Sequence, residues 1–212
     1  GNVGIGTTSP DTKLDIEALD VKQWSAHTPP TPSMASSKNG GFAPLDRTSK
    51  LYIGGKQARP DGNYSRPILS ADGHEIGQVG DGNRKDIRNA VEAAHKARGW
   101  ADRTPHNRAQ ILYYIAENLA IRADEFAARL VSMTGATPED AMQEVNQSID
   151  RLFTYAAWSD KYGGTVQETT LRGIVVGYHD YLGVIGIACP DDAPLLAFVS
   201  LLAPAIARGN TV

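Results

Sequence analysis

Residues 182–212, LGVIGIACPDDAPLLAFVSLLAPAIARGNTV, decide the fold of this chain. The stretch opens with an apolar segment, residues 182–189, which is rich in β-branched residues and too short for a globular helix. Such a segment predicts a strand that is buried on both faces. The sequence Pro-Asp-Asp-Ala-Pro at residues 190–194 interrupts it, and we expect Asp191 and Asp192 to cap the free N–H groups at the start of a helix.

The helix expected next is apolar nearly all round over residues 195–207, which indicates that it is buried. Gly209 and Asn210 supply a left-handed stop, and a second strand begins at Thr211. A strand, a tight turn, a buried helix and a new strand form the opening βα unit of a doubly wound sheet. We therefore expect an α/β fold whose Rossmann-like sheet is cut short at Val212.

This stretch also carries a resemblance to a known family. It resembles the start of the nucleotide-binding domain of aldehyde dehydrogenases, and the residues that fit that pattern are Gly183, Val184, Pro190, Pro194, Leu195, Pro204, Ala205, Gly209 and Asn210. The sequence CPDDAPLLAFVSLLAP at residues 189–204 is similar to one branch of the family in particular. That branch is the second, degenerate unit of the tandem aldehyde dehydrogenases known as family sixteen. The resemblance covers about residues 46 to 212.

The composition limits the classes of protein to which this chain can belong. Hydrophobic residues make up 41% of the chain and charged residues 21%, the balance of an ordinary soluble protein. A net charge of −3 gives no electrostatic case for a nucleic-acid or membrane partner. The single cysteine excludes an internal disulfide, and residues 1–20 show no signal-peptide pattern. We therefore expect a cytoplasmic protein.

The chain divides into three parts. Residues 1–16 resemble a short segment of phage tail-fibre shafts, so residues 1–23 are expected to be a foreign or fibre-like leader. Residues 24–46 are rich in Pro, Ser and Gly and are typical of a linker. Residues 47–212 then form a partial domain like that of an aldehyde dehydrogenase.

Two hairpins and a four-helix block are predicted before the sheet. The first hairpin turns at Gly54-Gly55, and the second, over residues 66–79, turns at Asp72-Gly73, a signal for a type I′ turn. The helix boundaries are expected at Asn83 with Asp86 as a capping box, Thr104-Pro105, Gly135, Thr137-Pro138 and Gly163-Gly164. The apolar stripes are expected at Ile87, Ala90, Val91 and Ala94; at Ile111, Ile115 and Leu119; at Phe126, Leu130 and Met133; and at Met142, Val145, Ile149, Leu152 and Phe153.

A β-ribbon is predicted over residues 165–181, with strands at 165–170 and 173–181. Half-polar strands suit an exposed edge that can pair with a partner strand. The resemblance implies that this ribbon projects from the subunit and builds oligomers. We expect it to bind a second copy of the chain or the remainder of a larger chain.

The resemblance also implies where aldehyde chemistry would reside. In the family a cysteine thiolate attacks the carbonyl, an Asn amide holds the oxyanion, NAD or NADP takes the hydride and a Glu activates water. The cysteine, the Glu and the cofactor-binding residues would all follow residue 212 in family order. The oxyanion Asn falls at Asp192, and an ionised carboxylate cannot donate to an oxyanion. We therefore expect no catalytic and no cofactor-binding residue, and no cofactor bound by this fragment.

The remaining candidate residues have ordinary explanations. Cys189 lies within the apolar strand and is expected to be a buried structural thiol. The histidines, at 27, 74, 95, 106 and 179, show no metal-ligand spacing, so no metal site is predicted. His95 and His179 are expected on the solvated surface.

Three hypotheses of function remain open. The first is a fragment of a catalytically silent aldehyde-dehydrogenase-like unit with a structural and oligomerisation role. The second is the first part of an active NAD(P)-dependent aldehyde dehydrogenase, which predicts a cysteine–glutamate pair beyond Val212. The third is a phage fibre or attachment protein built on residues 1–16.

Overall fold

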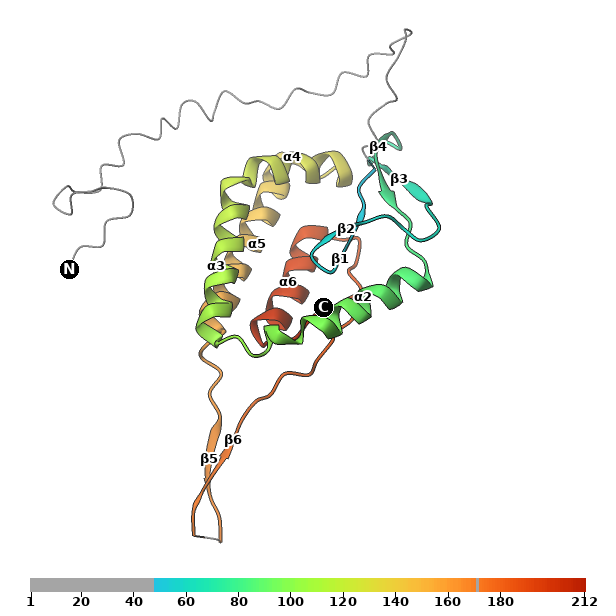
Figure 1. Ribbon diagram of the computed structural model, residues 1–212. Coiled ribbons are helices and arrows are strands. Elements are labelled where there is room, and N and C mark those ends of the chain that lie inside the picture. The colour runs from blue at the N-terminus through green and yellow to red at the C-terminus, as the bar shows by residue number, and fades with distance from the viewer. Residues whose placement is uncertain (1–47, 171) are drawn as a thin grey trace, which may run out of the picture. The chain divides into compact units, whose positions relative to one another are not determined.

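The computed structural model describes residues 48–170 and 172–212 (Figure 1). The predicted leader at residues 1–23, the linker at residues 24–46 and His27 lie outside the described residues. The described residues form a mixed α/β arrangement of short hairpins, a helical block and the start of a βα unit, as the sequence predicted. Among them, no helix has both the length and the apolar character needed to cross a membrane.

Two hairpins precede the helices. Strands β1 (Leu51–Ile53) and β2 (Lys56–Ala58) pair antiparallel, and both turn residues, Gly54 and Gly55, have positive φ, as a type I′ turn requires. Strands β3 (Ser65–Leu69) and β4 (Glu75–Gly80) form the second hairpin.

The predicted type I′ turn of the second hairpin is wrong. Of Asp72 and Gly73, only Gly73 has positive φ, at 80°. The carbonyl of Ser70 accepts from the Gly73 amide at 2.9 Å, and the strand register shifts between Ile68 and Leu69. The turn is therefore closed by a left-handed glycine with a local bulge, which spares Asp72 the positive φ that a type I′ turn would impose.

Helices α2, α3 and α5 begin where their capping residues predicted. Helix α2 (Arg84–Lys96) has a complete capping box between Asn83 and Asp86 and is followed by the 3₁₀ turn η1 (Ala97–Trp100). The Thr104 and Thr137 side chains cap α3 (Pro105–Ile121) and α5 (Pro138–Trp158), each with proline in its first turn. Helix α4 (Ala123–Thr134) ends at left-handed Gly135. Helix α5 stops at Trp158, earlier than the predicted Gly163-Gly164.

The core lies where α3, α5 and α6 (Pro194–Ala207) pack together. Its fully or almost fully buried members are Leu112, Ala116, Leu152, Ala156, Val199, Ala203 and Ala207. Helix α4 adds a smaller cluster around Val145. Of the stripe predicted for α3, Leu119 is buried as expected, but Ile111 and Ile115 are 37% and 42% exposed, and Leu112 and Ala116 are buried instead. Apolar residues surround much of α3, so contacts with α5 and α6 select the buried face.

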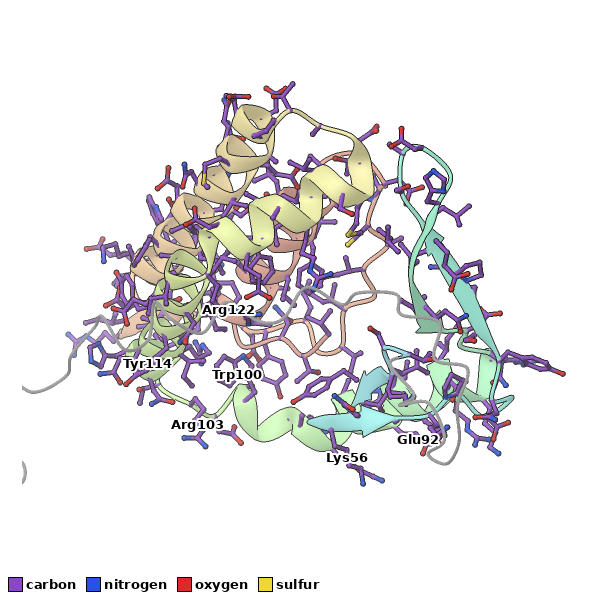
Figure 2. The ribbon with its side chains drawn as sticks, turned by 90° about the horizontal axis from the view of Figure 1, so that it is seen from above. Lys56, Glu92, Trp100, Arg103, Tyr114 and Arg122 are labelled. Atoms are coloured by element: carbon purple, nitrogen blue, oxygen red, sulfur yellow. The ribbon has the colours of Figure 1, made fainter. Side chains whose placement is uncertain are left out.

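The outer side of α3 faces solvent. Tyr114 projects from it in Figure 2 and is 69% exposed. The stripes of α4 and α5 are largely confirmed, since Leu130, Val145 and Leu152 are buried, although Met133 and Phe153 lie nearer the surface. Those two helices carry polar residues between their apolar positions, which marks the buried face more sharply than in α3.

The predicted ribbon is present and projects away from the helices (Figure 1). Strand β5 (Thr165–Glu168) pairs antiparallel with β6 (Ile174–Gly177), and every residue of both strands is exposed. The strands are shorter than predicted. At the base of the ribbon, Arg208 donates to the His179 carbonyl at 3.0 Å and lies over the Tyr162 ring at 4.9 Å.

Candidate functional site: the βα turn and its groove

The segment before α6 is not the doubly buried strand that its composition predicted. Residues 182–189 make a single parallel bridge, between Val184 and Thr211. The Ile185 amide donates to the Thr211 carbonyl at 2.8 Å, and the Thr211 amide donates to the Gly183 carbonyl at 3.0 Å. Leu182 is 89% exposed. A parallel strand is buried by neighbouring strands and covering helices, and the described residues supply only Thr211 as its backbone partner.

The prediction for Cys189 is wrong for the same reason. Its thiol is exposed, because the segment that carries it is covered on too few sides to be part of a core. The βα turn that follows is exposed as well, including Asp191 and Asp192.

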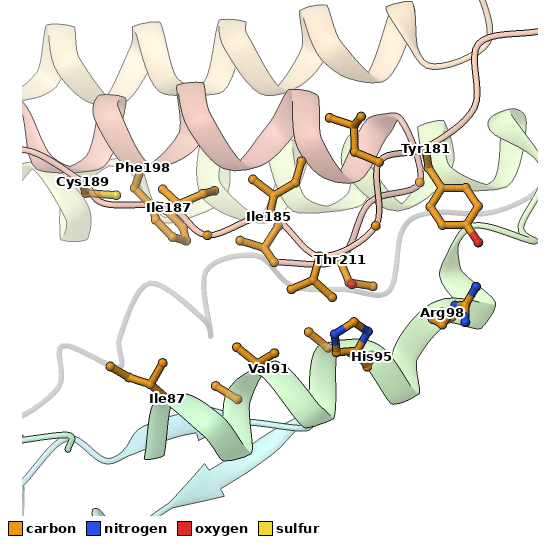
Figure 3. A pocket seen from close by; sticks show the side chains of 18 residues that line it. Ile87, Val91, His95, Arg98, Tyr181, Ile185, Ile187, Cys189, Phe198 and Thr211 are labelled. Carbon is orange, nitrogen blue, oxygen red and sulfur yellow. The ribbon is translucent and has the colours of Figure 1, made fainter. Parts of the chain in front are cut away.

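A large apolar groove runs beside this segment. Its volume is about 960 Å³, and its walls are the apolar stripe of α2 and residues 181–189 (Figure 3). Ile87 and Val91 line it from α2 and are 66% and 41% exposed, while Ile187 and Phe198 line it from the other side. The stripe predicted for α2 therefore exists but is left open.

One end of the groove is polar. His95, Arg98 and Tyr181 lie there (Figure 3), and a hydrogen bond with Tyr181 raises the pKa of the Arg98 guanidinium. His95 and His179 are exposed, as predicted. In the described part of the chain, no group of three or more His, Cys, Asp or Glu side chains is placed to hold a metal ion.

The start of α6 is capped by a side chain from another helix, which the sequence did not suggest. Ala193 occupies the N-cap position itself, in the left-handed region with φ 45° and ψ 61°, and no side chain of the turn bonds to the helix. The predicted capping by Asp191 and Asp192 is therefore wrong. Instead, Oε1 of Glu144 on α5 accepts from the amides of Leu195 at 2.9 Å and Leu196 at 3.1 Å. A capping side chain normally extends from β-region backbone, which Ala193 does not adopt.

The C-terminal end of α6 is also fixed by hydrogen bonds. The predicted stop at Gly209 is confirmed, with φ 86°. The Gly209 amide donates to the Ile206 carbonyl at 3.0 Å, and the Asn210 amide donates to the Ala205 carbonyl at 3.1 Å, the pattern of a Schellman motif. The Trp100 indole also donates to the Ile206 carbonyl, at 2.8 Å.

Two further side chains connect α6 to its surroundings. Arg108, 6% exposed, donates through Nε to the Ala207 carbonyl at 3.0 Å and through a terminal nitrogen to the carbonyls of Ala101 and Arg103. Burial and the nearby Arg208 lower its pKa. The Asn210 side chain accepts from the Leu182 and Gly183 amides at 2.7 and 3.0 Å. Asn210 thus ties the strand segment to the end of α6.

Comparison with known proteins assigns this arrangement to a family. Residues 58–212 match the model of the aldehyde dehydrogenase family. The chain belongs to the aldehyde dehydrogenase family. The matched region takes in the second hairpin, the helical block, the ribbon and the βα unit with its Asp192 turn, and it begins at the last residue of β2.

Curated aldehyde dehydrogenases agree with this assignment. Aldehyde dehydrogenase B of Escherichia coli (strain K12) is 28% identical over 190 residues, which cover 88% of this chain and 37% of that protein. An aldehyde dehydrogenase of Agaricus bisporus is 32% identical over 167 residues, 76% of this chain and 33% of that protein. The chain thus spans about a third of the length of these aldehyde dehydrogenases.

Solved structures share the fold. A point mutant of betaine aldehyde dehydrogenase from Staphylococcus aureus, in complex with NAD+, superposes with a TM-score of 0.72 and 24% identity over 76% of this chain and 34% of that chain. A mutant aldehyde dehydrogenase from Bacillus cereus gives a TM-score of 0.75 and 23% identity over 77% of this chain and 34% of that chain. At these identities the likeness establishes the aldehyde dehydrogenase fold.

Sequence reasoning missed Glu144 and Arg108 as structural residues. Glu144 is 51 positions from Leu195, and Arg108 is 99 positions from Ala207. Neither residue stands in a local capping pattern, so only the packing of α3, α5 and α6 reveals these contacts. Asn210 was recognised as part of the helix stop, but its bonds to Leu182 and Gly183 were not anticipated.

Proposed function

We propose that this chain is part of a catalytically silent aldehyde-dehydrogenase-like unit whose role is structural. The observation that carries the proposal is Asp192, which stands where the family pattern has the Asn that stabilises the oxyanion. Aldehyde oxidation by this family passes through an oxyanion that needs hydrogen-bond donors. An ionised Asp192 offers only acceptors and a negative charge.

The energetic cost of this substitution is large. Removing one oxyanion donor costs roughly 2.7–4 kcal/mol of transition-state stabilisation, and repulsion between two negative charges adds to it. Asp192 is exposed at the βα turn and makes no cap to α6, so the exchange of Asn for Asp has no alternative explanation in helix capping.

The branch of the family is also part of the proposal. The sequence of residues 189–204 supports assignment of the chain to the second, degenerate unit of the tandem aldehyde dehydrogenases, family sixteen. We further propose that this chain binds neither NAD nor NADP, and that it resides in the cytoplasm. The fibre-protein hypothesis depends on residues 1–16, which lie outside the described residues, whereas the family match covers residues 58–212.

The structural role is proposed to be oligomerisation through the ribbon at residues 165–181. Its support is a two-stranded sheet whose Val166, Ile174 and Val176 are 71%, 77% and 46% exposed. Paired strands with apolar side chains and free outer edges suit addition of a partner strand.

Two measurements test the proposal. In the first, the chain is mixed with a short aliphatic aldehyde and NAD+ or NADP+, and absorbance of the reduced cofactor is followed. No turnover is expected, and any protein-dependent reduction would refute catalytic silence.

The second measurement is the oligomeric state by light scattering. Val176→Glu, on the ribbon, should dissociate the oligomer, whereas Ile121→Glu, at an exposed site on α3, should leave it intact. Equal masses for the two variants would exclude the ribbon.

A further inference from the structure

We propose that Glu144 is the positioning residue of the βα turn: its carboxylate takes the place of a local cap and closes the start of α6 to outside anions. The observation is the pair of hydrogen bonds from Leu195 and Leu196 to Oε1 of Glu144. This inference is independent of whether the unit is catalytically silent.

The amides at the start of α6 are fully used. Pro194 is the first helical residue and has no N–H to satisfy. Leu195 and Leu196 both donate to Glu144, and the Ala197 amide donates to the Ala193 carbonyl at 2.8 Å, which begins the helical ladder. From Pro194 to Ala197, each N–H group of the helix therefore has a protein acceptor.

The position of Glu144 is also electrostatically favoured. A carboxylate at a helix N-terminus interacts favourably with the partial positive charge of the helix dipole. That end of a helix is the place where βα units bind phosphate groups, through the same free amides. Because Glu144 occupies both amides, a phosphate or carboxylate from solution finds its hydrogen-bond donors already engaged.

The contact fixes the turn as well as the helix. Glu144 lies in the second turn of α5, next to fully buried Val145, so its backbone is anchored in the core. Leu195 packs against both core clusters. The left-handed Ala193 and the turn that carries Asp192 are therefore held between the strand segment and a helix whose first turn is bonded to α5.

Other titratable groups must be distinguished from Glu144 in any test. Helix α6 itself carries no charged residue. The elements next to Glu144 carry several titratable groups. They are Asp191 and Asp192 in the turn; Glu139, Asp140, Asp150, Arg151 and Tyr155 on α5; Asp124, Glu125 and Arg129 on α4; and His106, Arg108, Tyr113, Tyr114 and Glu117 on α3, which also packs against α5. Of these, Asp140 bonds to Thr137, and Glu125 pairs with Arg122.

The test follows the backbone amide resonances of Leu195 and Leu196 by NMR during an acid titration of the chain. In the wild type both resonances should shift together as a carboxylate protonates. Glu144→Gln should abolish this shift while keeping an oxygen that accepts both hydrogen bonds, so the helix start stays folded. Asp150→Ala, which removes a carboxylate from the same helix without touching α6, should leave the shift unchanged.

Hydrogen exchange supplies a second readout. Exchange of the Leu195 and Leu196 amides should be about fivefold faster in Glu144→Ala, the typical effect of losing a helix cap, and unchanged in Asp150→Ala. If the resonances still titrate in Glu144→Gln, another carboxylate such as Asp191 or Asp192 is the cap, and the proposal is overturned. Equal exchange in Glu144→Ala and Asp150→Ala would overturn it too.

Discussion

The two halves of the βα unit, helix α6 and the strand segment, differ in how many of their hydrogen bonds and packing contacts the described residues supply. Helix α6 has one face in the core, its first amides bonded to Glu144 and its last carbonyls bonded to Trp100 and Arg108. The strand segment at residues 182–189 has one bridge and an open groove beside it. A helix makes its hydrogen bonds internally, so it needs only packing and capping, whereas a strand is complete only between other strands.

The largest expected effect comes from making the same Leu→Ala substitution in the helical core and in the strand segment at residues 182–189. Leu112→Ala, at a fully buried position on α3, should lower the free energy of unfolding by about 3 kcal/mol, since it removes core contacts and leaves a cavity. Leu182→Ala, at a position 89% exposed on the strand segment, should change it by less than about 0.5 kcal/mol. Urea denaturation measures both. Similar losses would mean that the strand segment is buried in solution.

Arg108 tests how firmly the end of α6 is held. Arg108→Met should lower the free energy of unfolding by about 2–3 kcal/mol, because three backbone carbonyls lose a charged donor. Arg103→Met, on the loop between η1 and α3, should have little effect because that side chain is exposed. Thermal unfolding compares the two variants. If they melt together, Arg108 does not support α6.

Asn210 joins the two halves. Asn210→Ala should cost about 1–2 kcal/mol, because the amides of Leu182 and Gly183 lose their acceptor and the Ala205 carbonyl loses a donor. The same variant should speed hydrogen exchange at Leu182 and Gly183 while leaving Leu195 protected. Protection that falls equally at all three amides would show that the halves unfold as one unit.

The smallest expected effect lies outside the βα unit, at the ion pair between Asp61 and Lys85. A hydrogen bond from Lys85 is the main cause that lowers the pKa of Asp61 below its ordinary value of 3.8. A lowered pKa in the folded state means that the pair stabilises the protein above pH 3.8 and loses this contribution as the pH falls through the folded value. Lys85→Met should therefore melt slightly below the wild type at neutral pH, and the difference should vanish in acid. A difference that persists in acid would assign it to another contact.

Much of the fold was predictable, because its signals are local. The capping box at Asn83, the threonine caps at 104 and 137, and the left-handed glycines at 135 and 209 each act within a few residues. The alternation of residues 165–177 likewise predicted the ribbon. These features depend on neighbouring residues alone, so a sequence can be read for them directly.

The site was less predictable because its contacts are distant in sequence. The composition of residues 182–189 is that of a buried strand, yet burial depends on strands that the described residues do not supply. Asp191 and Asp192 fit a capping pattern, but the left-handed backbone of Ala193 and the arrival of Glu144 from α5 replace it. Pattern alone cannot choose between a local and a distant carboxylate.

Calorimetric titration of the chain with NAD+ at millimolar concentration tests the central claim most directly. The claim is that this member of the aldehyde dehydrogenase family is a structural unit that holds no nicotinamide cofactor. The expected result is heat of dilution only, with no saturation. A saturable isotherm would contradict the claim and favour an active dehydrogenase.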